Sequence, residues 1–405
     1  SPAVDAAGRA QYLTAVWDAD ALRAALRTGT VRARDLVPPG AVTAAVGDVD
    51  DVDTPEALQD ARLQAARCPD CARAAIRGAV VPLPPRELDA PDAVGAVLHV
   101  PLVAAAPFPP FDASAMDGWA VAGPGPWVPD GGPVPAGGGD GGTLPGGRAR
   151  RIATGARLPA GAARVIRDEE VTVDGDVVRT NGSGPSERDD TRRRGSEWRA
   201  GETLVAAGTR VDDAVASLAR SSGVARLTVS GPVRAVLHTS GDEIAWDGMP
   251  IDPDRPLLPE AAAGPVGARL RGLGVLVARG THLPDEPAAL DAALGDTTDL
   301  VVVIGATGRG VADHLRGAIT RVGGTVIVDG VDVRPGGSVL AATLPGGRIL
   351  LGLGGNPLAA VAGAALLAPA VVDGLTGGGP AVPEHIVVAG FAAADRWRIA
   401  PVGPA

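Results

Sequence analysis

The feature that most constrains the fold lies between residues 231 and 375, where strand patterns alternate with helix patterns. Apolar runs such as DLVVVIGA are each followed by a helix-like stretch. Parallel strands need a crossover of about a dozen residues or more, usually a helix, so this alternation predicts a parallel α/β sheet covered on both faces. Ligands bind such sheets where the carboxyl ends of strands meet the amino ends of helices. We therefore expect a ligand site at that edge.

Three glycine-containing loops follow strands at this predicted edge. They are HTSGDEI at 238–244, GATGRGVAD at 305–313 and GLGGNPLAA at 352–360. Glycine lets the backbone approach a ligand closely, and a helix amino end offers unpaired N–H groups and a partial positive charge. One such loop alone is most often only a turn. Three on one edge predict a phosphate-binding site.

Two of the loops also carry acidic residues. Asp242 and Glu243 close the first loop, and Asp313 closes the second. Carboxylates repel a phosphate unless a cation bridges them, and Mg²⁺ is the usual cation. We therefore expect Asp242 and Asp313 to hold Mg²⁺. The alternative for each acid taken singly is a stabilising charge at a helix amino terminus.

The remainder of the chain predicts further cores, because 405 residues exceed what one ordinary core holds. Residues 121–200 contain short β runs between glycine and proline clusters, and Asp174-Gly175 predicts a hairpin. We expect an inserted β-rich domain there. Residues 72–98 predict a helix, a turn and a second helix. Residues 1–66 read as strand and helix fragments, with Thr54-Pro55 beginning a helix.

Composition excludes two classes of partner. The formal net charge is −10, and all 37 basic side chains are arginine, which argues against nucleic acid as a general partner. We find neither a signal sequence nor an uninterrupted apolar stretch of about 20 residues, so we expect a cytoplasmic protein without a membrane partner. Aromatic residues make up only 2% of the chain, so the cores must be built from Ala, Val and Leu.

The two cysteines form a single C-x-x-C motif, Cys68 and Cys71. A structural zinc site needs four ligands, and no adjacent βαβ pattern indicates a redox centre. We expect a reduced, structural pair, with metal binding and redox chemistry as the alternatives.

Seven stretches together resemble the molybdopterin molybdenumtransferase family, in order and spacing, over residues ~72–405. They are PPFDASAMDGWAV, RIATGARLPAGAARVIRDEE, GSEWRAGETLVAAG, VLHTSGDEI, VVIGATGRGVAD, VRPGG and LGLGGNPLAA. The resemblance implies insertion of molybdate into adenylylated molybdopterin with release of AMP, assisted by Mg²⁺. It also implies a homodimer whose cleft lies between the α/β domain of one subunit and the SAMDG segment of the other, and contacts with other cofactor-synthesis proteins.

The resemblance implies a domain layout as well. The first domain would combine 72–120 with 201–228, around a β-rich insertion at 121–200. The molybdopterin-binding α/β domain would span 231–375, and a shortened C-terminal β domain 376–405. Residues 1–66 resemble the carboxy-terminal end of a molybdenum cofactor guanylyltransferase-like nucleotidyltransferase, whose nucleotide loop would lie upstream. We expect this segment to be the tail of a larger fusion, or else a generic α/β appendage.

The positions that match the family's motifs give the candidate site. Catalytic roles are implied for Asp117, Glu243, Asp313 and Asp285. Substrate binding is implied for Thr154, Ser240, Gly241, Asp242, Gly305, Gly308, Arg309, Gly310, Arg334, Pro335, Gly336, Asn356 and Pro357. Metal binding is implied for Asp313 and Asp242.

Three loops depart from the family pattern, and one of them is LGGNP at 353–357, where the family has Leu-Pro-Gly-Asn-Pro. The family's Gly-Gly-Val-Ser-Val-Gly is GATGRG at 305–310 here, and its Lys-Pro-Gly-Lys-Pro is RPGGS at 334–338. The change at 334–338 removes a cation, and losing one such donor costs about 2.7–4 kcal/mol of transition-state stabilisation. Binding should survive better than catalysis, and Arg309 restores a charge. The alternatives are therefore a degenerate homologue that binds or carries the pterin without metal transfer, and a non-catalytic assembly scaffold.

Overall fold

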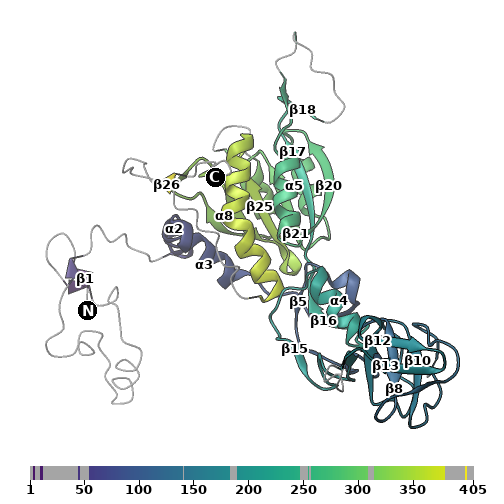
Figure 1. Ribbon diagram of the computed structural model, residues 1–405. Coiled ribbons are helices and arrows are strands. Elements are labelled where there is room, and N and C mark those ends of the chain that lie inside the picture. Colours follow the sequence, from purple (N-terminus) through teal and green to yellow (C-terminus); the bar gives the residue numbers. More distant parts are fainter. Residues whose placement is uncertain are drawn as a thin grey trace, which may run out of the picture. The chain divides into compact units, whose positions relative to one another are not determined.

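The computed structural model describes residues 54–139, 141–182, 189–246, 254, 257–308 and 314–378, with the backbone of four further two-residue strand segments (Figure 1). These segments are 3–4, 10–11, 44–45 and 397–398. The chain divides into two compact units, residues 1–65 and residues 66–405, which are taken separately below.

The described residues of the first unit form three short strands and one helix. The strands are β1 (Ala3–Val4), β2 (Ala10–Gln11) and β3 (Ala44–Ala45), in the order β2-β1-β3. Helix α2 (Pro55–Ala65) begins where the sequence predicts, because the Thr54 hydroxyl accepts the Ala57 amide at 3.0 Å. The other strand and helix fragments expected before residue 54 lie outside the described residues, apart from the backbone of these three strands. The resemblance of this segment to a nucleotidyltransferase stays a prediction.

The second unit is built around a six-stranded sheet of order β20-β17-β21-β25-β24-β22. Its strands are β17 (Arg234–Ser240), β20 (Leu276–Leu283), β21 (Leu300–Ile304), β22 (Thr325–Asp329), β24 (Leu340–Thr343) and β25 (Ile349–Leu353). The first four in spatial order are parallel, whereas β24 runs antiparallel to both neighbours. The prediction of an entirely parallel sheet is therefore wrong, because a short connection after β24 turns the chain directly into β25.

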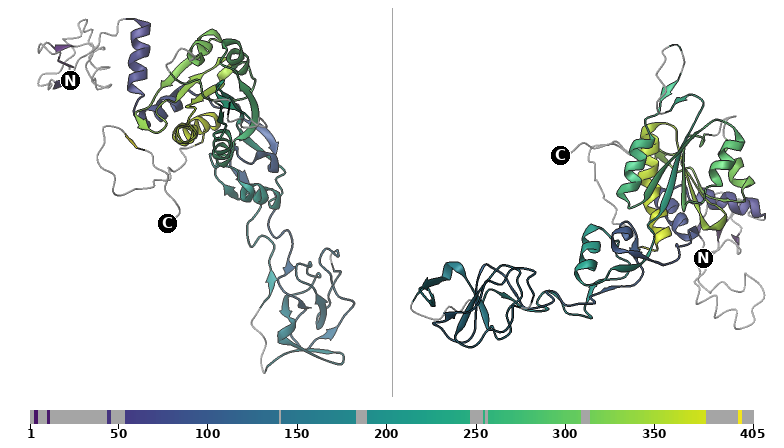
Figure 2. Two further views of the ribbon diagram at one scale, coloured as in Figure 1. Left: turned by 90° about the horizontal axis from the view of Figure 1, so that it is seen from above. Right: turned by 90° about the vertical axis from the view of Figure 1, so that its right-hand side faces the viewer.

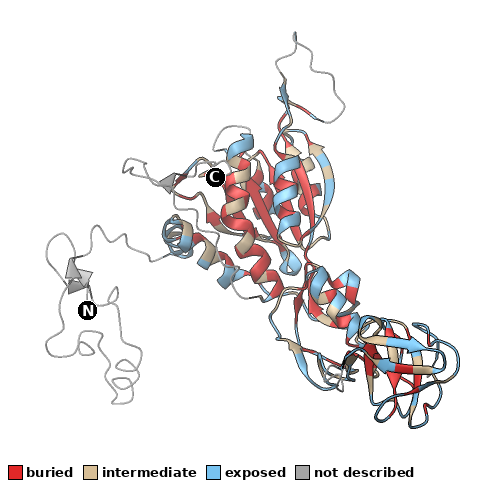
Figure 3. Cartoon of the chain, in the orientation of Figure 1, coloured by how far each residue is buried: buried red, intermediate tan, exposed pale blue. Residues whose placement is uncertain are grey.

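Helices cover both faces of this sheet, as predicted (Figure 2). One face packs on α3 (Pro69–Ala79), α5 (Ala263–Gly272) and α8 (Pro357–Thr376), and the other on α6 (Pro287–Leu294) and α7 (Leu315–Arg321). Every residue of β21 and β25 is buried, which explains their uninterrupted apolar sequences (Figure 3).

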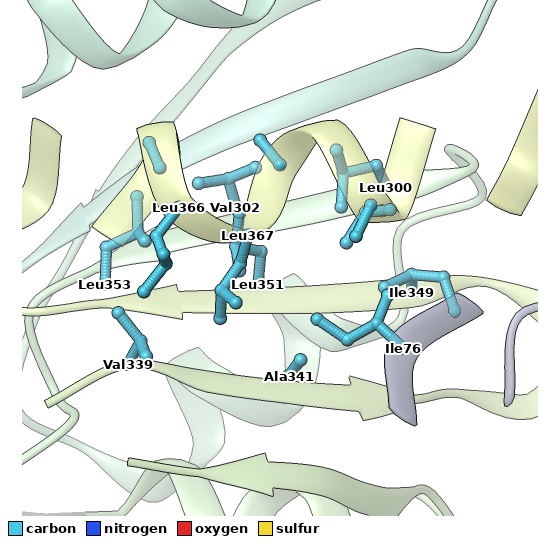
Figure 4. Packing of buried hydrophobic residues seen from close by; sticks show 14 of the residues in the cluster. Ile76, Leu300, Val302, Val339, Ala341, Ile349, Leu351, Leu353, Leu366 and Leu367 are labelled. Atoms are coloured by element: carbon cyan, nitrogen blue, oxygen red, sulfur yellow. The ribbon is translucent and has the colours of Figure 1, made fainter. Parts of the chain in front are cut away.

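Helix α8 supplies the largest share of the core (Figure 4). Its Leu366 and Leu367 pack over Val302 of β21 and Leu351 of β25, and full burial of each leucine contributes about 1.5–3 kcal/mol. The helix is long and apolar enough to cross a membrane by length and composition, but 67% of its apolar window is buried within the protein. Burial of this kind is typical of a core helix.

A smaller sheet of order β4-β16-β5 follows α3 in the chain. Its strands are β4 (Arg86–Asp89), β5 (Val97–Leu98) and β16 (Arg226–Ser230), joined by the 3₁₀ helix η3 (Ala90–Ala93) and packed with α4 (Asp213–Ser221). The second helix expected within 72–98 is therefore wrong. Pro91 opens only a single 3₁₀ turn, and Gly95 then adopts a φ of +90°.

Residues 102–205 form a β-rich insertion. A ribbon of β6 (Leu102–Val103) and β15 (Thr203–Val205) leads into it, and its main sheet has the order β11-β8-β10-β9. These strands are β8 (Gly118–Val121), β9 (Val128–Pro129), β10 (Arg148–Ile152) and β11 (Arg164–Arg167). The remaining strands are β7 (Ala113–Ser114), β12 (Val171–Asp174), β13 (Val177–Thr180) and β14 (Thr191–Arg192). The predicted hairpin is confirmed, since Asp174 pairs with Val177.

Four short strands complete the second unit: β18 (Ile244–Ala245), β19 (Leu258–Pro259), β23 (Val333–Arg334) and β26 (Trp397–Arg398). The expected C-terminal β domain, 376–405, lies outside the described residues except for 376–378 and the backbone of β26. Cys68 and Cys71 are joined in a disulfide, so the prediction of a reduced pair is wrong. The motif brings the two sulfurs together because Cys68 is the N-cap of α3 and Cys71 lies in its first turn.

Candidate functional site

The loops predicted to line one edge of the sheet do follow neighbouring strand ends. In the sheet register Thr239 lies between His282 and Ile304, and Ile304 lies beside Leu353. Strands β20, β17, β21 and β25 therefore end together. A fourth predicted loop, 330–338, reaches the same edge, because β22 ends there and Leu340 of β24 pairs with Gly352. Turns from five strands thus meet at one edge.

The loops after β17 and β20 hold each other through two aspartates. The Asp285 amide donates to the Asp242 carboxylate at 3.2 Å, and the Asp242 amide donates to the Asp285 carboxylate at 3.4 Å. The Ser240 hydroxyl lies 3.5 Å from the same Asp285 carboxylate. Three residues predicted for the site, Ser240, Asp242 and Asp285, are therefore brought together. Each carboxylate faces a main-chain donor of the opposite loop.

Two glycines let the loops approach closely. Gly305 has a φ of +100°, and a Cβ added there would lie 2.5 Å from the Ser240 carbonyl oxygen. Gly241 has a φ of +126°, and an added Cβ would lie 2.6 Å from a carboxylate oxygen of Glu243. The Glu243 side chain thus folds back over Gly241. A side chain at Gly305 would push its loop away from Ser240, whereas one at Gly241 would displace the Glu243 side chain and strain the backbone.

Hydrogen bonds to helices α8 and α7 fix the loops after β25 and β21. Asn356 caps α8, because its side-chain oxygen accepts the Ala359 amide at 3.1 Å, and Pro357 opens the helix. Gly308 is tied through its carbonyl to the Arg316 guanidinium at 3.0 Å, and Arg316 also pairs with Asp329 at 2.5 Å. The sequence pattern of the loop did not indicate Arg316, which lies beyond it on α7.

The loop after β21, which the sequence predicts to bind phosphate, is described only up to Gly308. The predicted site residues Arg309, Gly310 and Asp313 lie outside the described residues. Arg334 is exposed, and within the described part of the chain its guanidinium makes no hydrogen bond or ion pair. Gly336, two residues on, packs against α8, where an added Cβ would lie 3.0 Å from the Gly363 amide. Pro335 joins these two positions, so this turn presents an arginine at the edge from a fixed backbone.

A cavity of about 530 Å³ opens beside the loops after β17 and β20. His282 lines it, and its ring nitrogens contact the Gly241 carbonyl at 3.1 Å and the Thr239 hydroxyl at 3.0 Å. Trp246 stacks on His282 with ring centroids 6.3 Å apart, and Arg279 and Glu260 complete the polar lining. No sequence motif predicted this aromatic pair. A histidine three residues before Asp285, in a chain with only five histidines, was the available signal.

The neighbouring His238 points to the opposite face of the sheet, where it is buried and hydrogen-bonded to the backbone. Its Nδ1 accepts the Thr281 amide at 3.1 Å, while its buried Nε2 has no partner. Burial lowers the pKa of His238, so the ring stays neutral near pH 7.

The remaining two site residues lie together in the β-rich insertion. Asp117 precedes β8 and Thr154 follows β10, whose strands pair Gly118 with Ile152. One Asp117 carboxylate oxygen accepts the Thr154 amide at 2.7 Å and the Thr154 hydroxyl at 3.1 Å. These bonds, and the positive charge of Arg151, hold the pKa of Asp117 below its ordinary value. Both residues are exposed, so a fixed and ionised carboxylate faces outward.

The described residues hold no group of three or more His, Cys, Asp or Glu side chains arranged for a metal ion. Mg²⁺ needs fewer protein ligands when a substrate phosphate supplies the others, usually one or two carboxylates. Asp242 and Asp285 fit that smaller requirement, because each has one carboxylate oxygen bonded to a main-chain amide of the opposite loop.

Two family models match the chain. "MoeA N-terminal region (domain I and II)" matches residues 68–223, and "Probable molybdopterin binding domain" matches residues 237–373. The chain belongs to the molybdopterin molybdenumtransferase family. Its predicted resemblance to that family is therefore confirmed, and the second match contains all the strand-end loops described above.

Named relatives and solved structures agree with this assignment. A molybdopterin molybdenumtransferase of Synechococcus elongatus is 29% identical over 53% of this chain and 54% of its own length. Molybdopterin molybdenumtransferase 2 of Mycobacterium tuberculosis is 32% identical over 56% and 58%. The chain thus spans little more than half the length of these relatives. A molybdopterin biosynthesis MoeA structure from Pyrococcus horikoshii shares the fold, with a TM-score of 0.55, 23% identity, and coverage of 76% of this chain and 80% of that one.

Proposed function

We propose that this chain inserts molybdate into adenylylated molybdopterin, with release of AMP, as a step of molybdenum cofactor biosynthesis in the cytoplasm. The substrate would bind at the loop edge of the α/β sheet. The observation that carries the proposal is the meeting of five strand-end turns at one edge, where Asp242, Asp285 and Glu243 lie beside glycine turns of unusual backbone. Such an edge suits an anionic, phosphate-bearing ligand.

The chain's own residues divide the work as follows. Main-chain amides of the loop after β21 hold a phosphate, with Gly305 allowing the close approach. Arg334 attracts molybdate, because it is an exposed cation without an ion-pair partner among the described residues. Glu243 orients the water or oxyanion that attacks the phosphoanhydride. Asp242 and Asp285 would hold Mg²⁺, which would neutralise phosphate charge when bound, and the predicted ligand Asp313 lies outside the described residues.

Asp117 would act on the substrate from a second subunit of a homodimer. Its carboxylate is ionised and fixed by Thr154, yet it belongs to the β-rich insertion instead of the sheet edge. An exposed, oriented acid of this kind is suited to contact a ligand bound on a neighbouring protomer. The proposed site takes the β-rich insertion as residues 102–205, so that it includes Asp117, and combines it with the α/β domain predicted at 231–375 and the split first domain.

The direct test is AMP release by the purified chain. We expect AMP only when adenylylated molybdopterin, molybdate and Mg²⁺ are all present, and a loss of about 100-fold in Glu243→Gln, since general acid–base groups typically contribute 10²–10⁴-fold. Asp254→Asn, which changes an acid outside the assigned edge, is the matched control. No AMP from the unmodified chain, under conditions where a family relative is active, would refute transferase activity.

A second candidate function rests on the changed turn after β23. Gly337 stands where the family carries a second cation, so the turn offers Arg334 alone. Under this candidate the chain binds and carries the pterin nucleotide without transferring metal. Tight binding of adenylylated molybdopterin, measured by calorimetry, with no AMP formed would favour the carrier.

A further inference from the structure

The cysteine motif lies outside the proposed site and has its own geometry. Cys68 and Cys71 are both exposed and are bonded to each other at the amino end of the eleven-residue helix α3. Cys68 is the N-cap, and its sulfur accepts the Cys71 amide at 3.1 Å. Both cysteines are therefore accessible to solvent, and the Cys68 sulfur already accepts a hydrogen bond from a main-chain amide.

The disulfide is expected to contribute little to the stability of the fold. A cross-link stabilises mainly by restricting the unfolded chain, and the effect grows with the length of the loop that it closes. Only two residues separate Cys68 from Cys71. Helix α3 is held independently, because Ala72 and Ile76 are buried in the core and the Arg73 guanidinium bonds the Leu366 carbonyl of α8 at 3.0 Å.

The segment before the helix is anchored as well. The Arg67 guanidinium pairs with the Asp332 carboxylate at 3.1 Å, and the Arg67 carbonyl accepts the Asp332 amide at 2.8 Å. The backbone on both sides of the cysteines would thus keep its place when the S–S bond opens. Opening and closing of the bond is a local event.

We propose that Cys68 and Cys71 form a thiol–disulfide exchange site whose co-reactant is a dithiol. A thiolate of the dithiol attacks the Cys71 sulfur, the S–S bond breaks, and Cys68 leaves with the electron pair as a thiolate. The Cys71 amide and the helix amino end stabilise that thiolate. The second thiol of the reagent then displaces Cys71. Two electrons and two protons pass to the protein, and the dithiol becomes a disulfide.

Alkylation kinetics test this assignment in the full chain. Cys71→Ser leaves Cys68 as the single cysteine, and Cys68→Ser leaves Cys71. With iodoacetamide at pH 7 we expect Cys68 to react about tenfold faster than Cys71, because thiolate stabilisation at a helix amino end favours the reactive form. In urea, where α3 is unfolded, the two rates should agree within about twofold. The unmodified chain, reduced with dithiothreitol, should recover its disulfide in glutathione disulfide without a change in its unfolding midpoint.

Three results would overturn the proposal. They are equal alkylation rates in the folded variants, failure of the disulfide to re-form, and a large drop in the unfolding midpoint on reduction. A large drop in the unfolding midpoint would show that the disulfide stabilises the fold. None of these measurements needs pterin or molybdate, so failure here leaves the proposed transferase activity untouched.

Discussion

At the scale of single residues, Asp117 has the best-defined chemistry of the candidate site. The Thr154 amide contributes most to lowering its pKa, the Thr154 hydroxyl follows, and burial opposes both. A carboxylate whose pKa is lowered by folding stabilises the protein above its ordinary pKa, and that contribution is lost as the pH falls through the lowered value. Asp117 therefore ionises more readily than an ordinary aspartate.

Thr154→Ala should raise the pKa of Asp117 towards its ordinary value. The rise should be partial, because the variant removes only the hydroxyl and leaves the stronger amide bond. Titration of the carboxyl carbon by NMR measures the effect. Thr209→Ala, which removes a hydroxyl from a loop elsewhere in the chain, serves as control and should leave the titration unchanged. An unchanged Asp117 pKa in Thr154→Ala would contradict the geometry described.

At the scale of elements, the sequence predicts a strand wherever a run of residues is so apolar that only a buried strand fits it. β21 and β25 are continuous apolar runs, and β17 and β20 precede clear helix patterns, so the edge and its loops follow from periodicity. β24 was missed because Leu340 to Thr343 is a short, alanine-rich segment without alternation. The stacking of Trp246 on His282 was also missed, since His282 lies in β20 and Trp246 follows β18, so the two residues meet only in the folded protein.

Helix α8 offers a test of the role of Asn356, which sequence reasoning assigned to substrate. Its side chain caps the helix through the Ala359 amide. Asn356→Ala should lower the free energy of unfolding by about 1 kcal/mol, while Asn356→Ser should retain most of it, because serine also caps well. Urea denaturation measures both. If Asn356→Ala is as stable as the unmodified chain, the cap contributes nothing and a ligand role becomes the better assignment.

The turn after β21 offers a second test. Gly305→Ala combines a strained backbone with a clash against the Ser240 carbonyl, whereas Gly346→Ala has the same sign of φ and open space around it. Each strained position costs about 1–3 kcal/mol, and the clash should make Gly305→Ala the worse of the two by about 1 kcal/mol or more. Equal losses in denaturation midpoint would show that the two loops are not tightly packed.

At the scale of the whole molecule, the proposed site needs two parts of the fold. The sheet edge supplies Glu243 and the phosphate-binding turns, and the β-rich insertion supplies Asp117. Sequence motifs indicate both parts, because each has its own local pattern. How the parts of two protomers come together depends on surfaces whose pattern is not periodic, so neither hydrophobic spacing nor turn chemistry predicts it.

Subunit complementation tests this central claim most directly. Asp117→Asn and Glu243→Gln are each expected to release little AMP alone, and a mixture that exchanges subunits pairs one intact Asp117 with one intact Glu243 in each mixed dimer. Random exchange makes half of the dimers mixed, each with one whole site, so activity should return to about a quarter of the unmodified level. If mass spectrometry shows mixed dimers and the mixture stays as inactive as the separate variants, Asp117 and Glu243 do not share a substrate across the interface.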